Sequence, residues 1–244
     1  MSLLYEYRVF LFSGFIQTLL MSLVVAAGTT MVAIVLVIAV RSRQRVIRIA
    51  GYTLVEVLRD IPLMVNVLMV YFMLPLVGLG FGPFWSACIA ISVWGGANGA
   101  QILRAGLNSV GNGQREAAAA FNFGPAKTLL LIVLPQAMPV IIPPYVGLMT
   151  AVVQATSLGA VVGAQELLRS GQILIEQTTI MRGGSPAYLV YGSILVVYFI
   201  LCSLISFAGG RLEAFYKRPY RGDANEDRIE SRIHDIEATV QTSA

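Results

Sequence analysis

The chain has 244 residues, of which 57% are hydrophobic and only 12% are charged, and its mean hydropathy is +0.75. Soluble domains carry about a quarter charged residues, so this composition excludes an ordinary soluble fold. The net charge of +4 comes from basic residues between apolar stretches, and no aromatic-interleaved basic motif indicates a nucleic-acid partner.

Five apolar stretches predict membrane-spanning helices. A spanning helix needs about 20 apolar residues, and the uncharged runs supply them near residues 14–40, 61–78, 84–104, 132–156 and 187–210. Pro75, Gly78 and Pro83 separate the second run from the third. The first run is too long for a cleaved signal peptide and lacks a basic leader. We therefore expect an all-α integral membrane protein whose membrane domain covers residues 1–217.

Basic residues predict the orientation, because positively charged loops remain in the cytoplasm. They follow the first, third and fifth predicted helices, at Arg41, Arg43, Arg45, Arg48, Arg104, Arg115, Lys127, Arg211, Lys217, Arg218 and Arg221. The alternate side holds only Arg8, Arg169 and Arg182. The N-terminus is therefore expected outside and the C-terminus in the cytoplasm.

A helix–turn–helix is predicted in the cytoplasmic segment after the third span. Gln114–Phe121 favours a short helix, since it holds four consecutive alanines and no β-branched residue. Asn122 tolerates the left-handed conformation and Gly124-Pro125 does not continue a helix easily, so a turn is expected there. A second helical run begins at Ala126. Because pieces this short are marginal alone, we expect the first helix to dock on a partner protein rather than on lipid headgroups.

The same stretch resembles the EAA motif of ABC-importer permeases, which reads EAA, three residues, Gly, nine residues, Ile, one residue, Leu-Pro. The match runs from "EAA" at 116–118 to Ile132 and Leu134-Pro135, and Asn122 replaces the glycine. In that family the loop forms the coupling helix, which enters a groove on the ATPase subunit. The resemblance implies ATPase-coupling residues at Glu116, Ala117, Ala118, Asn122 and Gly124.

Residues 12–216 as a whole resemble the polar amino-acid subfamily of these permeases, which includes histidine, glutamate, arginine and opine importers. The similar segments are "EVLRDIPLMVNVLMVYFMLP" (56–75), "ANGAQILRAGLNSV" (97–110) and "ATSLGAVVGAQELLRSGQ" (155–172). The resemblance implies a bacterial inner-membrane subunit, surrounded by lipid, that pairs with a second permease, two ABC ATPases and an extracytoplasmic solute-binding protein. ATP and magnesium would be held by the ATPases, since this chain has no G-x-x-x-x-G-K-[ST] loop and is expected to hold neither a cofactor nor a catalytic group.

Polar residues inside the predicted spans are the candidates for a substrate pathway, because such residues are costly in lipid. They are Asn98, Gln101, Gln154, Thr156 and Ser157. Hydrogen bonding between helices, without substrate contact, is the alternative for each. In the subfamily that the chain resembles, positions 101, 154 and 155 are usually Glu, Lys and Asp, and this chain has Gln101, Gln154 and Ala155. Either it is the non-binding half of a heterodimer, which we favour, or its substrate is less charged or bulkier.

The regions outside the spans are less informative. Residues 158–186 are expected to face outward, either as a cap that meets a binding protein or as a solvated loop. Residues 218–244 are expected to form a charged cytoplasmic tail with one apolar stripe from Ile229 to Val240. The single histidine, His234, lies in this tail, and Cys88 and Cys202 lie far apart in predicted spans, so no metal site is expected.

The sequence therefore predicts a permease subunit that moves solute by alternating access and is driven by ATP hydrolysis on a partner. The alternative is an ion-coupled secondary transporter or channel subunit. That class needs coupling charges or a selectivity ring within the spans, and Arg59 and Asp60 are the only candidates.

Overall fold

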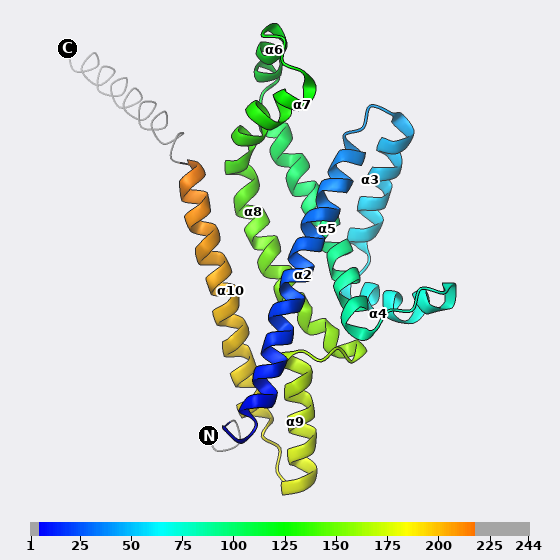
Figure 1. Ribbon diagram of the computed structural model, residues 1–244, viewed down its shortest axis with the longest axis vertical. Helices are drawn as coiled ribbons and strands as arrows, with labels where there is room; N and C mark the ends of the chain where they lie inside the picture. Colours follow the sequence, from blue (N-terminus) through cyan, green and yellow to red (C-terminus); the bar gives the residue numbers. More distant parts are fainter. Residues whose placement is uncertain (1–4, 218–244) are drawn as a thin grey trace, which may run out of the picture.

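The computed structural model describes residues 5–217, and this part of the chain is helical and contains no strand. Residues 218–244, with the predicted apolar stripe and His234, lie outside the described part. Figure 1 shows an elongated bundle with α6 and α7 at one end and α9 and the N-terminus at the other. The elements are α2 (Arg8–Val40), α3 (Arg45–Asp60), α4 (Leu63–Met73), η1 (Leu74–Val77), α5 (Pro83–Ser109), α6 (Asn112–Ala120), α7 (Pro125–Thr128), η2 (Leu129–Val133), α8 (Leu134–Ala155), η3 (Thr156–Val162), α9 (Leu167–Arg182) and α10 (Ala187–Lys217).

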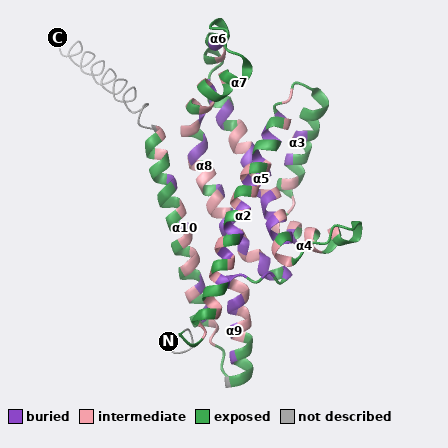
Figure 2. Cartoon of the chain, in the orientation of Figure 1, coloured by how far each residue is buried: buried purple, intermediate pink, exposed green. Residues whose placement is uncertain are grey.

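The central helix of the bundle is α5. It packs against α2 on one face and against α8 on another, and buried residues gather along these contacts (Figure 2). Gly95, Gly96 and Gly99 permit the close approach: a Cβ atom at Gly95 would collide with both Thr29 of α2 and Val152 of α8. Small residues bring membrane helices together in this way, because lipid supplies no hydrophobic force between them.

Each of the five predicted helical ranges contains a helix: α2, α4–η1, α5, η2–α8 and α10. Among the described residues, three helical runs are long and apolar enough to cross a membrane: Arg8–Val40, Pro125–Val162 and Ala187–Tyr216. Glycines and polar residues give α5 a lower hydropathy. Its 27 residues nevertheless exceed the length needed for a hydrocarbon core of about 30 Å at about 1.5 Å per residue.

The predicted helix near 61–78 corresponds to α4 and η1, but α3, which precedes it, was not predicted. The structure has an α3–α4 pair bent by 102°, which could serve as one broken span. The reason is Pro62, which has no N–H and drives the preceding residue out of the helical conformation. Ile61 is extended, with φ −72° and ψ 126°. The charged residues before Pro62 therefore lie in a helix, α3, whereas the sequence analysis placed them in a loop.

The predicted helix and turn after α5 are confirmed. α6 begins two residues before the predicted start, and Asn122 follows it with φ 59°, the left-handed conformation. The N–H of Asn122 donates to the Ala119 carbonyl at 2.9 Å, and that of Phe123 to the Ala118 carbonyl at 3.0 Å. This pair of bonds is the Schellman arrangement that ends helices. Asn122 thus performs the role that glycine has at most such ends.

The α2–α5 crossing provides a stability test. A side chain at Gly96 would collide with Val32 of α2, and overpacking of this kind costs about 1–3 kcal/mol. We expect Gly96→Leu to unfold at a lower temperature than wild type in detergent. Gly147→Ala in α8 is the control, because a Cβ there meets nothing within 4 Å. Equal midpoints for Gly96→Leu and wild type would contradict this packing.

Candidate functional site

A row of polar side chains on α5 faces α3. Asn98, Gln101 and Arg104 recur every three residues, so they share one face of the helix. Nε of Arg59 donates to Oδ1 of Asn98 at 3.3 Å, and Nε2 of Gln101 donates to Oε1 of Glu56 at 2.9 Å. Arg104 donates to Oε1 of Gln101 at 3.3 Å. Two amides predicted as pathway residues are therefore joined to a charged helix.

These residues, with Tyr52, form what we call the α3–α5 polar cluster: Tyr52, Glu56, Arg59, Asn98, Gln101 and Arg104. Glu56 and Arg59 form an ion pair at 3.5 Å, and their side chains are 52% and 36% exposed. The Arg104 guanidinium stacks on the Tyr52 ring, 4.5 Å from its centroid. One carboxylate and two guanidiniums thus lie on an open face of an apolar chain. Charged groups in membrane helices face a partner or a water-filled space rather than lipid.

Sequence reasoning missed most of this cluster. It named Arg59 only as a candidate coupling charge, and it treated Glu56 only as part of a similar segment. The available signal was the spacing of Tyr52, Glu56 and Arg59, which places them on one face of a helix. The pairing with α5 joins residues 39 and 45 positions apart, and no local pattern reveals it.

Of the remaining predicted pathway residues, Gln154 lies beside α10, and Thr156 and Ser157 lie at the start of η3. Gln154 lines an open cleft of about 600 Å³ between α8 and α10, together with Tyr198 and Ser203. The buried Thr156 donates its hydroxyl to the Val153 carbonyl at 2.7 Å, and Ser157 donates to the Gln154 carbonyl at 2.8 Å. Within residues 5–217, no hydrogen bond or ion pair joins this group to Asn98 or Gln101. The five predicted residues therefore form two groups.

A buried carboxylate holds the start of α9. Glu166 is 1% exposed, and its side chain accepts from the backbone N–H groups of Leu168 (2.8 Å) and Arg169 (2.7 Å), which caps the helix. The Tyr198 hydroxyl of α10 donates to it at 2.9 Å, and Thr18 of α2 accepts from the Leu167 N–H at 3.0 Å. Burial raises the pKa of Glu166, and these hydrogen bonds oppose the rise. The segment predicted to face outward thus contains the helix α9, whose start is hydrogen-bonded to α2 and α10.

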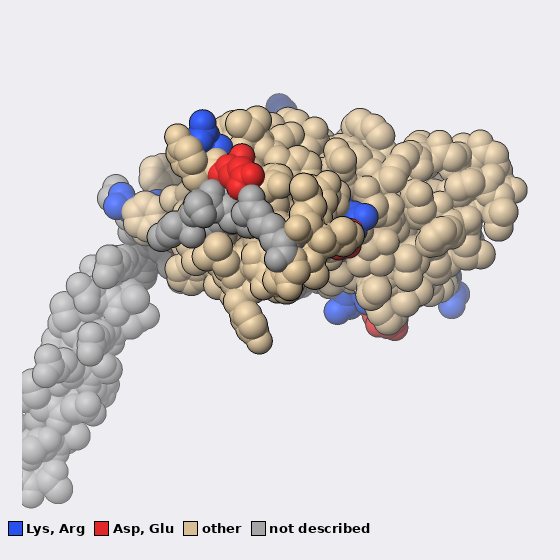
Figure 3. All heavy atoms as spheres, turned by 90° about the horizontal axis from the view of Figure 1, so that it is seen from below, with Lys and Arg blue, Asp and Glu red and all other residues tan. Residues whose placement is uncertain are grey.

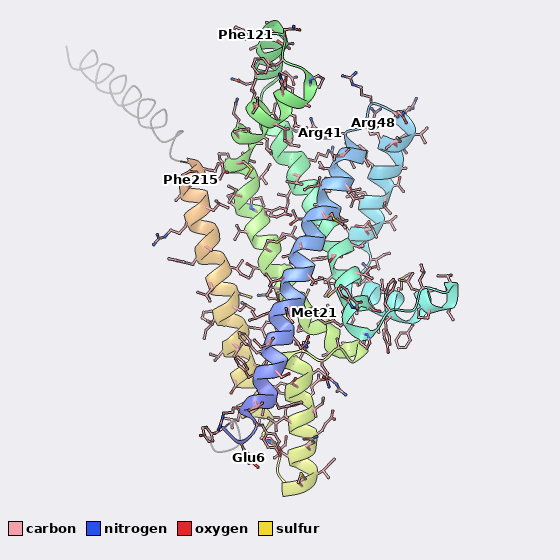
Figure 4. All side chains as sticks on the ribbon, viewed as in Figure 1. Glu6, Met21, Arg41, Arg48, Phe121 and Phe215 are labelled. Carbon is pink, nitrogen blue, oxygen red and sulfur yellow. The ribbon has the colours of Figure 1, made fainter. Side chains whose placement is uncertain are left out.

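The coupling candidates lie on the projecting end of the molecule. Ala118 is buried, whereas Glu116, Ala117, Asn122 and Gly124 are exposed. Phe121 is at the tip of this projection (Figure 4), with 79% of its surface exposed. An aromatic side chain so exposed beside small alanines offers a compact anchor for a partner protein.

The α6 end and the α9 end of the bundle differ in charge. Arg41 and Arg48 lie at the α6 end (Figure 4), and the same end carries Arg43, Arg45, Arg115 and Lys127. Seen from the α9 end, most of the described surface is uncharged (Figure 3). Among residues 5–217 no group of three His, Cys, Asp or Glu residues could hold a metal ion.

Comparison with known proteins identifies the family. The family described as "Binding-protein-dependent transport system inner membrane component" matches residues 30–212. The chain belongs to this family. It is therefore a permease component of an ABC transport system, and the alternative of an ion-coupled transporter or channel is not favoured.

Two glutamine permeases are similar to most of the chain. A probable glutamine ABC transporter permease protein of Bacillus subtilis, GlnP, is 30% identical over 217 residues, which are 85% of this chain and 94% of the relative. The Escherichia coli K12 glutamine transport system permease protein GlnP is 33% identical over 161 residues, 65% of this chain and 71% of the relative.

Solved structures share the fold. A chain from the crystal structure of "an amino acid ABC transporter with histidines" superposes with a TM-score of 0.76 at 23% identity, covering 86% of this chain and 96% of that one. A chain of the inward-facing MetNI methionine ABC transporter gives a TM-score of 0.70 at 24% identity, covering 87% and 99%. The helical arrangement is thus that of ABC permeases.

The raised pKa of Glu166 leads to a prediction about pH. The folded chain keeps the Glu166 proton at a pH where the unfolded chain, near the ordinary value of 4.5, has released it. The free energy of unfolding therefore falls as pH rises through the raised pKa. We expect the unfolding midpoint of wild type, relative to Glu166→Gln, to fall as the pH rises above the ordinary pKa of 4.5.

Tyr198→Phe gives a second measurement of the same group. It removes the hydroxyl donor that stabilises the charged Glu166 carboxylate. The pKa of Glu166 should therefore rise further, and the fall in the unfolding midpoint should extend to higher pH. A wild-type midpoint that rises with pH relative to Glu166→Gln would mean that the hydrogen bonds outweigh burial.

Proposed function

We propose that this chain is a five-span permease subunit of an ABC importer for polar amino acids or related compounds. The observation that carries the proposal is the projecting α6 with its left-handed turn at Asn122, in a chain of this transport family. Relatives named as glutamine permeases support the substrate class. The partners are ABC ATPases, which hold ATP and magnesium, a second permease and an extracytoplasmic solute-binding protein.

The membrane arrangement follows from charge and helix length. The five spans are α2, the bent α3–α4 pair, α5, η2–α8 and α10, and residues 1–217 form the membrane domain with 218–244 as a tail. The basic α6 end faces the cytoplasm, because positively charged segments are retained there. The C-terminus is then cytoplasmic and the N-terminus lies outside, in a bacterial inner membrane.

Docking on the ATPase uses the α6 end. Ala117 and Ala118 permit close approach of a partner surface, and Asn122 with Gly124 fixes the direction of the exposed Phe121. Glu116 is the fifth of the nine residues of α6, and its exposed carboxylate lies on this docking helix. ATP-driven closure of the two ATPases then moves α6 and reorients the paired spans, which is alternating access.

The substrate pathway is the α3–α5 polar cluster together with Gln154, Thr156 and Ser157. An amino acid carries one ammonium and one carboxylate. In the cluster Glu56 suits the ammonium, Arg59 suits the carboxylate, and the amides of Asn98 and Gln101 can bond either group. Because Gln154 and Ala155 lack the charges usual at these positions, the partner permease supplies those charges in a heterodimer. Both halves then contact the substrate, in place of the non-binding role favoured from the sequence alone.

The docking part of the proposal is tested by purification from native membranes in mild detergent. We expect wild type to bring down an ATPase subunit and a second permease, and Glu116→Lys to lose the ATPase subunit, because it reverses a charge on the docking helix. Glu176→Lys, the same change on α9, is the control and should retain both partners. If wild type purifies without an ATPase, the importer proposal fails.

The pathway part is tested by Glu56→Gln, which removes a charge while keeping the size of the side chain. Hydrogen bonds to charged groups contribute about 1.5–3 kcal/mol, so we expect the apparent affinity in transport to fall about tenfold or more, with the ATPase still bound. Asp60→Asn is the matched control on the same helix, since Asp60 is exposed outside the cluster. Wild-type transport by Glu56→Gln would exclude this carboxylate from the pathway.

A further inference from the structure

The carbonyl groups at the end of α5 accept hydrogen bonds from α6. Nη2 of Arg115, near the start of α6, donates to the Leu107 carbonyl at 2.7 Å, and Nη1 donates to the Val110 carbonyl at 3.4 Å. Nη1 also donates to Oδ1 of Asn112 at 3.1 Å. One guanidinium therefore joins α5, the linker and α6.

This contact suits the chemistry of both partners. The last carbonyls of a helix have no donor within the helix and carry a partial negative charge, which a cation stabilises. The Ser109 hydroxyl donates to the Gly106 carbonyl at 2.7 Å, so Arg115 serves the next carbonyl along. A planar guanidinium donates to several acceptors in a fixed geometry, and a lysine ammonium does not.

α6 has few other links to the bundle. Ala118 is the residue of this nine-residue helix that is buried, and Gln136 of α8 donates to Gln114 at 3.2 Å on the exposed surface. A helix so short gains little stability from its own backbone, so its orientation depends on such polar links. Besides the short backbone linker, the Arg115 guanidinium joins α6 to α5.

The end of α5 is also tied to α2, and its middle carries the polar cluster. Nη1 of Arg41, directly after α2, donates to Oδ1 of Asn108 at 2.8 Å. Burial, and then the neighbouring charge of Arg115, lowers the pKa of Arg41. Two cations thus converge on the end of α5, one from α2 and one from α6. Asn98 and Gln101 lie further along the same helix, in contact with α3.

We propose that Arg115 is the positioning residue through which a movement of α6 reaches α5 and, along it, the α3–α5 polar cluster. The proposal rests on the proposed function of α6 as the ATPase-docking helix. Arg115 sets how much substrate is moved per ATP hydrolysed. The ATPase docks without it, because its guanidinium donates to α5 and the linker rather than outward.

The test uses the complete transporter in lipid vesicles with its solute-binding protein and the substrate. Arg115→Ala and Arg115→Lys are compared with Arg43→Ala, which removes the same charge from an exposed arginine at the same end. Each complex is assayed for retained ATPase subunit, for ATP hydrolysis and for substrate moved per ATP. We expect Arg115→Ala to retain the ATPase subunit and to move about tenfold less substrate per ATP.

Arg115→Lys should recover part of the loss, because an ammonium can still donate to the Leu107 carbonyl, and Arg43→Ala should match wild type. If Arg115→Ala does not fold in the membrane, Arg115→Gln is measured with the same expectation. An unchanged ratio of substrate to ATP would overturn the proposal. Loss of the ATPase subunit from the Arg115 variants would also overturn it, since the residue would then act on docking. Failure of the proposed function differs: wild type itself would bind no ATPase.

Discussion

The close contact of α5 with α2 and α8 is the constraint on which the rest of the structure depends. Lipid gives no hydrophobic force between helices, so they associate by packing closely and by hydrogen bonds. The glycines of α5 permit the close packing. A hydrogen bond at 2.9 Å between the Tyr145 hydroxyl of α8 and the Thr30 hydroxyl of α2 joins the other two helices. The three helices form one frame, and each functional feature is attached to a face or an end of α5.

The frame also determines where polar groups can lie. Because α2 and α8 cover the glycine faces of α5, its amides and Arg104 are turned toward α3, where Glu56 and Arg59 meet them. Pairing between helices lowers the cost of keeping charge in an apolar chain. At the end of α5 the same logic applies to carbonyl groups, which accept from Arg115. α5 thus contacts both the α3–α5 polar cluster and the proposed coupling element.

The distance over which residues act explains what the sequence could predict. The turn after α6 was predictable because Asn122 and Gly124-Pro125 act within a few residues. The boundary at Ile61 is local as well, because Pro62 sets it, and the predicted helix near 61–78 begins there. α3 was missed because Glu56 and Arg59 resemble loop charges until their partners, 45 and 39 residues away, are known. Glu166 is a similar case, since its partner Tyr198 is 32 residues along the chain.

The two ends of the bundle are built by different physical means. At the α9 end, Tyr198 of α10 donates to the buried Glu166, and the Leu167 N–H donates to Thr18 of α2. Separating α9 from both helices would leave polar groups unpaired. At the α6 end, exposed polar links hold a short helix with little apolar contact. Elements that move are drawn from the less stable parts of a structure. In the proposed mechanism, movement begins at α6 and travels along α5, while α9 stays joined to α2 and α10 at the opposite end.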